Sequence, residues 1–186
     1  MKLLRTDLPD VLILEPTVLR DDRGWFMESH NARRLDALLA DHGLPGGAAF
    51  VQDNHSCSAR NVLRGLHYQL PPHAQGKLVR VVQGRAWDVA VDIRRDSPTF
   101  GRWVGVELSA DNHRQLWIPP GHAHGFLALE DDTHFLYKTT DYYARESERA
   151  IAWNDPAIGI DWPLDGPPRV APKDAAAPPL AEADLF

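Results

Sequence analysis

The residues best suited to chemistry lie in the segment Leu63–Gln69 and at Lys77, which follows the histidine of that segment by ten positions. Histidine titrates near neutrality, which suits His67 to proton transfer. Arg64 and Lys77 add two cations, which can hold phosphate oxygens or stabilise an enolate oxygen formed when a proton leaves carbon beside a carbonyl. The same residues also fit a half-buried histidine on a solvated, cationic strand edge. The rest of the chain must decide between these interpretations.

The elements that position these residues are predicted to be short strands. From Phe50 onward, apolar and polar residues alternate with a period of two, which is typical of strands. Strands are expected at 11–14, 78–82, 86–93, 103–108, 115–118, 126–129 and 133–138, with Gln83-Gly84 closing a hairpin. Many short strands separated by turns predict an all-β antiparallel sandwich or jelly roll, whose open mouth is a usual place for ligands.

One short helix is expected before this region. Asn31 can cap it, Leu35, Leu38 and Leu39 form its apolar face, and Gly43 ends it. We expect one domain spanning residues 1–186, with an irregular, surface-wrapping tail from about residue 163 that is rich in proline and alanine.

Composition narrows the classes of partner. The net charge of −6 disfavours a nucleic-acid-binding protein and confines any anion site to a local cationic pocket. No apolar run approaches the roughly 20 residues that span a membrane, so no membrane partner is expected. Cys57 is the only cysteine, which fits a reducing compartment, and no leader opens the chain. We therefore expect a cytoplasmic protein.

A metal site is the main chemical alternative. His122 and His124 form an H-x-H pair within a P-x-G-x-x-H segment typical of cupins, and His67 would have to supply a third ligand. The earlier H-x-H with a following glutamate that metal-binding cupins carry is absent, so we expect no metal. Cys57 lacks a cationic setting, and no glycine-rich loop indicates a nucleotide cofactor.

Two tyrosines complete the set of reactive side chains. Tyr137 and Tyr143 are six residues apart, so within one strand they would face the same side. One could donate a proton and the other stack on a flat ring, although ordinary packing explains them equally well.

Collinear segments over nearly the whole chain closely resemble the dTDP-4-dehydrorhamnose 3,5-epimerases, the sugar-nucleotide epimerases of the deoxysugar pathway. The matching segments are 22–29, 50–56, 62–69, 75–80, 88–94, 97–101, 115–119, 124–126, 135–138, 153–156 and 173–178. The resemblance implies a cupin-like jelly roll with short peripheral helices, working as a homodimer without metal or organic cofactor. It also implies that dTDP-4-dehydro-6-deoxy-D-glucose is epimerised at C3 and C5 to dTDP-4-dehydro-L-rhamnose.

The resemblance also implies roles for individual residues. His67 would be the base, Asp174 its orienting partner and Tyr137 the acid on the opposite ring face, with Lys77 beside the enolate oxygen. Tyr143, favoured over Tyr142 by strand phase, would stack on thymine. The implied substrate contacts are Arg23, Glu28, Gln52, Asn54, Arg64, Lys77, His124, Glu148 and Lys173. Arg23, Arg64 and Lys173 would neutralise the diphosphate.

Three departures from the family pattern stand out. His30 and His122 replace a tyrosine and a phenylalanine and are expected near the barrel mouth, and the connector Gly43–Ala49 is longer than usual. Three alternatives stay open: an epimerase of C3 or C5 only, acting on a related dTDP-4-keto-6-deoxyhexose; a metal-dependent cupin oxygenase; and a module that binds a nucleotide sugar without turnover.

Overall fold

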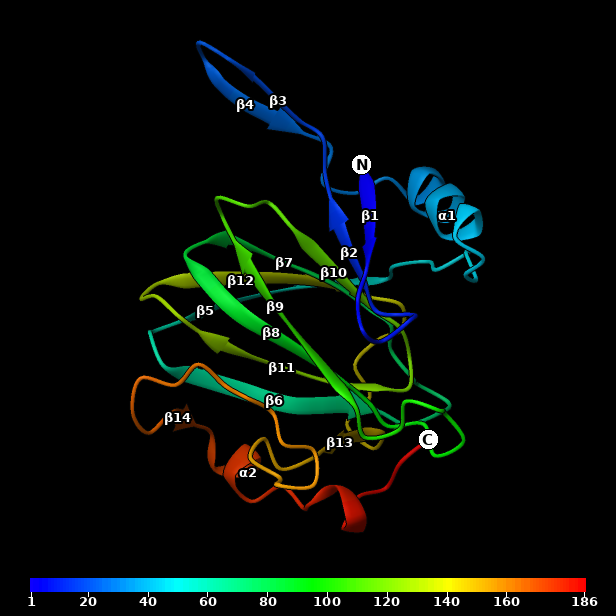
Figure 1. Cartoon of the computed structure of the whole chain (residues 1–186), viewed down its shortest axis with the longest axis vertical. Coiled ribbons are helices and arrows are strands. Elements are labelled where there is room, and N and C mark those ends of the chain that lie inside the picture. The colour runs from blue at the N-terminus through cyan, green and yellow to red at the C-terminus, as the bar shows by residue number, and fades with distance from the viewer.

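The computed structural model describes residues 1–186, which form two facing β-sheets with few helices (Figure 1). The first sheet has, in order, β1 (Lys2–Arg5), β2 (Leu12–Glu15), β10 (Gln115–Ile118), β7 (Lys77–Gln83), β12 (Thr133–Thr139) and β5 (Gln52–Ser58). The second has β13 (Glu148–Ala150), β6 (Val62–Gln69), β11 (His122–Ala128), β8 (Arg85–Asp92) and β9 (Trp103–Ser109), with β14 (Arg169–Val170) beside β6. Only β14 and β6 pair in parallel. The predicted all-β antiparallel jelly roll is confirmed.

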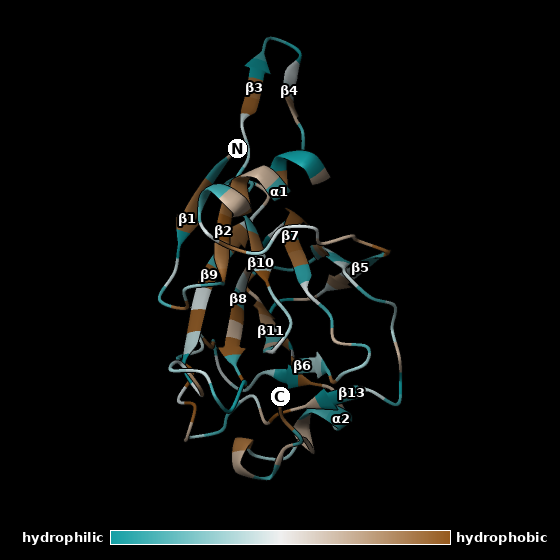
Figure 2. Ribbon diagram, turned by 90° about the vertical axis from the view of Figure 1, so that its right-hand side faces the viewer, coloured by the Kyte–Doolittle hydropathy of each residue, from teal (hydrophilic) through white to brown (hydrophobic).

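An apolar layer fills the space between the sheets. The rings of Phe126 and Phe135 stack with centroids 4.1 Å apart, and Val79, Ala90 and Leu108 are fully buried around them. Burying a large apolar side chain stabilises the fold by roughly 1.5–3 kcal/mol. Strand alternation therefore sends one face of each strand into this layer. The ribbons of β8 and β9 accordingly carry hydrophobic segments between paler or hydrophilic ones (Figure 2).

The expected hairpin at Gln83-Gly84 is wrong. β7 pairs with β10 and β12, whereas β8 pairs with β9 and β11 in the other sheet. Gly84 turns the chain from one sheet to the other with φ of +75°, and a Cβ there would lie 2.7 Å from Oγ1 of Thr133. Both strands send apolar side chains into the layer between the sheets, where Val79 and Val81 of β7 share one buried cluster with Ala86 and Ala90 of β8.

The predicted helix is confirmed as α1 (Ala32–Asp41). Oδ1 of Asn31 accepts a 3.2 Å hydrogen bond from the backbone N–H of Arg34, which caps the helix. Leu35 and Leu39 are buried in a cluster on the outer face of the first sheet, and Gly43 ends the helix region with φ of +73°. No helix in the molecule is both long and apolar enough to cross a membrane.

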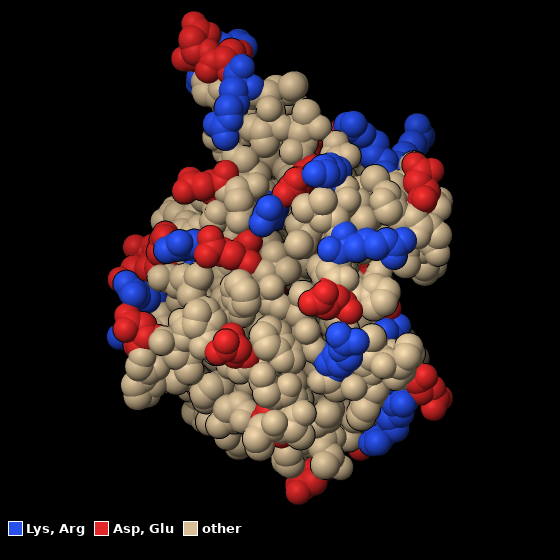
Figure 3. Space-filling model, in the orientation of Figure 1, with Lys and Arg blue, Asp and Glu red and all other residues tan.

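A separate hairpin, β3 (Val18–Asp21) with β4 (Gly24–Met27), projects away from the two sheets (Figure 1). Its tip carries charges of both signs (Figure 3). Leu19, Trp25 and Phe26 are large apolar side chains on it that are 61%, 52% and 68% exposed. Such a projecting apolar ribbon is typical of a surface that another chain covers.

The C-terminal tail is more regular than predicted. It contains β14, the short helix α2 (Pro172–Ala175) and a 3-10 turn η1 (Leu180–Glu182), and it lies along the second sheet. Leu180 and Ala183 are buried against that sheet. The tail therefore forms part of the core and carries α2 to the edge of β6.

Candidate active site

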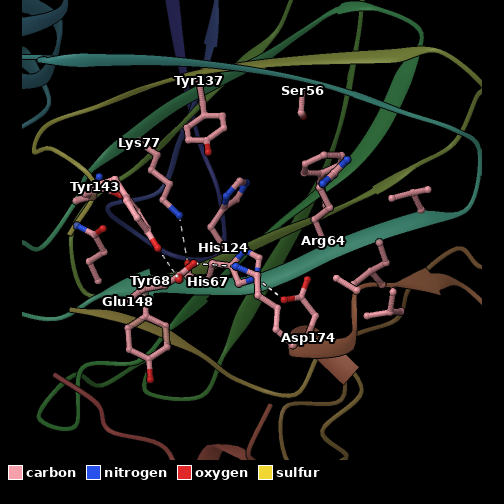
Figure 4. Close-up of a pocket in the computed structure, with 18 of the residues that line it drawn as sticks. Ser56, Arg64, His67, Tyr68, Lys77, His124, Tyr137, Tyr143, Glu148 and Asp174 are labelled. Atoms are coloured by element: carbon pink, nitrogen blue, oxygen red, sulfur yellow. Dashed lines mark hydrogen bonds and ion pairs between the residues drawn. The ribbon is translucent and has the colours of Figure 1, made fainter. Parts of the chain in front are cut away.

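A cavity of about 520 Å³ opens between the two sheets (Figure 4). Strands β6 and β11 line it from one sheet, and β7 and β12 line it from the other. The predicted residues that border it are His67, Asp174, Tyr137, Lys77, Arg64, His124, Tyr143, Glu148 and Lys173. Residues scattered between positions 64 and 174 thus converge on one space of a size suited to a small molecule.

His67 and Asp174 form a hydrogen-bonded pair at the wall of the cavity. Nε2 of His67 lies 2.6 Å from Oδ1 of Asp174, and the backbone N–H of Gly65 donates to Oδ2 at 3.1 Å. Burial alone would raise the pKa of Asp174, but the hydrogen bond and charge of His67 hold that pKa below its usual value. With the carboxylate ionised, Nε2 carries the proton and Nδ1 is left as the accepting nitrogen.

Gly65 allows this wall to form. A Cβ at this position would lie 2.5 Å from Cα of Gly125 on the neighbouring strand, and the residue has φ of +127°. Only glycine permits both the close approach of β6 to β11 and this backbone conformation. The glycine between Arg64 and Leu66 therefore serves the geometry of the site.

Tyr137 reaches the cavity from the opposite side to His67 and Asp174 (Figure 4). It comes from β12 in the first sheet, whereas His67 comes from β6 in the second. Burial raises the pKa of Tyr137, and the positive charges of Arg64 and Lys173 oppose that rise. A flat ring bound between the two sheets would therefore meet the imidazole on one face and the phenol on the other.

Lys77 is a buried cation inside the cavity. Its Nζ donates a 3.2 Å hydrogen bond to the backbone carbonyl of His67. Burial lowers the pKa of Lys77 to about 8, while Asp88 and Glu148 oppose the change. Nζ of Lys77 is thus held near the base.

A second histidine–carboxylate pair lies deeper. Nε2 of His124 is 2.7 Å from Oδ1 of Asp88, and both residues are buried. Sequence reasoning included His124 but missed Asp88. The signal was present, because a lone carboxylate stands between Ala86 and Ala90 on the face of β8 that turns inward.

Side chains from the later part of the chain form the rim. Oε1 of Glu148 accepts from Nζ of Lys173 at 2.9 Å, and Oε2 accepts from the hydroxyl of Tyr143 at 2.9 Å. The strand-phase argument for Tyr143 is wrong, because β12 ends at Thr139 and Tyr143 lies in the following loop. Tyr143 nevertheless borders the cavity, whereas Tyr142 is 63% exposed and does not.

Of three further predicted substrate contacts, Arg64 borders the cavity, whereas Gln52 and Asn54 do not. Nε of Arg64 donates to Oγ of Ser58 at 3.1 Å and the side chain borders the cavity. Gln52 and Asn54 hydrogen-bond to each other on β5 at 2.9 Å, and Gln52 also accepts from the backbone N–H of Tyr143. Asn54 borders a smaller cavity of about 240 Å³, which Tyr137 also lines.

Arg23 and Glu28 are not brought to the cavity within one chain. Arg23 stands at the tip of the projecting hairpin, with its side chain 85% exposed, and pairs with Asp21. Glu28 accepts hydrogen bonds from Asn31 and Arg34 beside α1. Both residues lie on or next to the hairpin, so a single chain does not assemble the full predicted set.

The two unusual histidines also lie outside the cavity, contrary to expectation. His30 packs edge-on against Phe50 with ring centroids 5.1 Å apart. His122 is buried, its Nδ1 donates to the carbonyl of Pro119, and its Nε2 faces Oδ1 of Asp10 at 3.4 Å. His122, His124 and His67 thus face three different partners, and no group of three or more histidine, cysteine or acidic side chains could hold a metal ion.

The fold and the cavity define a jelly-roll protein with a histidine–carboxylate pair and a buried tyrosine facing one cavity between its sheets. The family model for dTDP-4-dehydrorhamnose 3,5-epimerase matches residues 5–182. The dTDP-4-dehydrorhamnose 3,5-epimerase of Salmonella typhimurium is 56% identical over 185 residues, covering 100% of this chain and 98% of the relative. The chain therefore belongs to the dTDP-4-dehydrorhamnose 3,5-epimerase family.

Solved structures show the same likeness. A dTDP-6-deoxy-D-glucose-3,5-epimerase of Legionella pneumophila, in complex with dTDP-4-keto-L-rhamnose, superimposes with a TM-score of 0.93 at 50% identity, covering 98% of this chain and 94% of that one. A more distant 3'-monoepimerase of Streptomyces bikiniensis, in complex with dTDP-quinovose, has a TM-score of 0.87 at 32% identity, covering 95% and 87%. The fold is thus shared by double and single epimerases.

Proposed function

We propose that this protein is an isomerase that converts dTDP-4-dehydro-6-deoxy-D-glucose to dTDP-4-dehydro-L-rhamnose by inverting C3 and C5, a step of dTDP-rhamnose biosynthesis. The observation that carries the proposal is the placing of the His67–Asp174 pair and Tyr137 on opposite sides of one cavity (Figure 4). Inversion at carbon requires a proton to leave one face and return to the other. The membership of the chain in the epimerase family supports the choice of substrate.

The steps follow from the side chains. The C4 ketone acidifies the protons on C3 and C5, and Nδ1 of His67 removes one of them. The carboxylate of Asp174 stabilises the imidazolium that results. The electrons move onto the C4 oxygen as an enolate, which the ammonium of Lys77 stabilises. Tyr137 then delivers a proton to the opposite face of the carbon, and the ketone re-forms. Exchange with water takes the proton from the His67 imidazolium and returns one to the Tyr137 phenolate, and the same steps at the second carbon complete the double inversion.

The cations of the site explain how an acidic protein binds a diphosphate. Arg64 borders the cavity, and Lys173 stands at the rim with its side chain 62% exposed. A guanidinium can bind phosphate oxygens through two hydrogen bonds, and an ammonium adds a point charge. Tyr143 lies on the same rim and is 55% exposed as a residue, so its ring can stack on the thymine base of the nucleotide.

We further propose that the working form is a homodimer. Arg23 and Glu28 belong to the predicted substrate contacts, yet both stand on or beside the projecting hairpin, away from the cavity of their own chain. The hairpin exposes Trp25 and Phe26, which a second copy would cover. Exchange of hairpins between two copies would bring these side chains to the partner's cavity. Analytical ultracentrifugation measures the oligomeric state of the intact chain and of a variant from which residues 18–27 are deleted. The intact chain should sediment as a dimer and the deletion variant as a monomer. An intact chain that is monomeric and fully active would contradict the proposal.

The reaction itself is tested by incubating the protein with dTDP-4-dehydro-6-deoxy-D-glucose in deuterated water. Proton NMR of the product should show deuterium at both C3 and C5 and the L-rhamno configuration. Deuterium and inversion at only one carbon would instead indicate the single-site epimerase. Tight binding without any exchange would indicate a binding module, and activity that requires stoichiometric iron or zinc would indicate the metal-dependent alternative.

A further inference from the structure

Asp88 is a buried carboxylate that the steps above do not use. It lies on β8 with no exposed surface, between Ala86 and Ala90 on the inward face of the strand. Burying a carboxylate costs several kcal/mol unless partners compensate. Oδ1 accepts the hydrogen bond from Nε2 of His124, whereas Oδ2 is buried and makes no hydrogen bond within the protein. A small apolar side chain would suit this position better, unless the charge serves the cavity.

The first effect of Asp88 is on His124. Strand β11 pairs with β6 so that His124 stands directly opposite His67, and both side chains border the cavity (Figure 4). Because the carboxylate of Asp88 accepts from Nε2, the imidazole keeps its lone pair on Nδ1. Burial lowers the pKa of His124, although Asp88 opposes this, so the ring stays neutral. Asp88 thus presents His124 to the ligand as a hydrogen-bond acceptor of fixed orientation.

The second effect is on Lys77. Titratable groups from every neighbouring element border the cavity together with Lys77: Arg64, His67 and Tyr68 on β6, His124 on β11, Tyr137 on β12, Tyr143 in the loop after it, Glu148 on β13, Arg169 on β14, and Lys173 and Asp174 on α2. Both oxygens of Glu148 are already engaged, with Lys173 and Tyr143. Asp88 has a buried oxygen free of hydrogen bonds, and it is the carboxylate that most opposes the loss of positive charge at Lys77. Burial raises the pKa of Asp88 itself, and the charges of His124 and Lys77 oppose that rise. The charge of Asp88 in turn favours the ammonium form of Lys77.

We propose that Asp88 is a positioning residue of the epimerase site, which fixes the tautomer of His124 and keeps Lys77 in its ammonium form. The inference rests on the proposed epimerisation, in which the Lys77 ammonium stabilises the enolate. Asp88 does not itself contact the sugar. It acts from behind the cavity wall, through one hydrogen bond to His124 and through its charge.

The test is the pH profile of kcat/KM for Asp88→Asn, measured by epimerisation of dTDP-4-dehydro-6-deoxy-D-glucose, because kcat/KM reports the pKa values of the free enzyme. The amide keeps the shape and removes the charge. In the native protein kcat/KM should fall as the pH rises through the pKa of Lys77, about 8. In Asp88→Asn this alkaline limb should lie at lower pH, and a displacement of one pH unit lowers kcat/KM at pH 8 about fivefold. On the acid side of the limb KM should change little, because no substrate contact is lost.

Asp92→Asn is the matched control. Asp92 is a second buried carboxylate on β8, and its hydrogen bonds go to Arg94, Ser97 and Thr99, away from the cavity. Its replacement should lower the melting temperature and leave the alkaline limb in place. An alkaline limb that is the same in Asp88→Asn as in the native protein would overturn the inference. A native protein without any deuterium exchange would instead overturn the proposed function.

A second measurement needs no variant. Nitrogen-15 NMR of the imidazoles in the native protein should show His124 as the neutral Nε2–H tautomer throughout the active pH range. The inference is overturned if His124 carries its proton on Nδ1. This measurement decides the role of Asp88 even if Asp88→Asn does not fold.

Discussion

The carboxylate of Asp174 lies 2.6 Å from Nε2 of His67, although 107 positions separate the two residues in the chain. The parallel pairing of β14 with β6 brings the C-terminal tail alongside the strand of His67, and α2 follows directly. A further hydrogen bond from the backbone N–H of Gly65 fixes the other carboxylate oxygen. The tail is therefore a structural part of the site, and the imidazole has one orientation and one free nitrogen.

Asp174→Asn should lower kcat by about 10²-fold or more, within the range for loss of general acid–base assistance. If the amide keeps its oxygen on Gly65, its NH₂ group faces His67 and forces the proton onto Nδ1, where it blocks proton abstraction. Assays stopped at timed intervals would give kcat, and circular dichroism would show whether the variant is folded. A folded variant with native kcat would remove Asp174 from the mechanism.

Tyr137→Phe should still exchange protons for deuterium but should lose inversion at C5. The base on the other side of the cavity remains, so abstraction continues, whereas the acid on the opposite face is gone. NMR of both the recovered sugar and the product distinguishes these outcomes. If the stereochemistry of the product is unchanged, another group must act as the acid.

Lys77→Met should stabilise the fold while abolishing turnover. The pKa of Lys77 falls from the ordinary 10.5 to about 8 on folding, so the unfolded chain binds the proton more tightly. This penalty on folding is fully present below about pH 8 and disappears as the pH rises through 10.5. The penalty is on the order of 3 kcal/mol, because each unit of pKa shift corresponds to about 1.4 kcal/mol.

Urea unfolding near neutral pH should accordingly give Lys77→Met a higher midpoint than the native protein, with kcat close to zero. Lys77→Arg serves as the control, because arginine keeps its positive charge over the whole pH range of the measurement. A Lys77→Met variant that is less stable than the native protein near neutral pH would contradict the assignment of Lys77 as a strained, buried cation.

Arg23→Ala should weaken substrate binding without affecting the fold. The side chain is 85% exposed and contacts only Asp21, so the free energy of unfolding should change by less than about 0.5 kcal/mol. If the hairpin reaches the partner's cavity, kcat/KM should fall about tenfold through loss of a charged contact with the diphosphate. An unchanged kcat/KM would exclude Arg23 from the site.

The period-two alternation predicted the strands at 78–82, 86–93, 103–108, 115–118 and 133–138, because it directly reports which side chains turn inward. It did not single out β5 or β6, the strand that carries His67. It did not predict how strands pair. Gln83-Gly84 resembles a hairpin turn locally, but the choice between pairing β7 with β8 and packing them face to face depends on the whole barrel. The C-terminal tail illustrates the same limit, since its proline- and alanine-rich composition gives no sign that β14 pairs with β6.

The site residues also divide into those that local sequence indicated and those that it did not. Arg64, His67 and Lys77 lie close together in sequence, so their type and spacing alone indicated proton transfer near an anion. Asp174 was assigned only by resemblance, and the resemblance alone chose Tyr137 over Tyr143 as the acid, because contacts over such separations leave no local pattern. Arg23 is different again, since its predicted role is not met within a single folded chain.

The most direct test of the account is the uptake of deuterium at C3 and C5 by His67→Asn in deuterated water. We expect the native protein to label both carbons and the folded variant to label neither, because His67 is the histidine that Asp174 orients and an amide cannot take up the proton. Uptake by His67→Asn at the native rate at either carbon would contradict the assignment of His67 as the base.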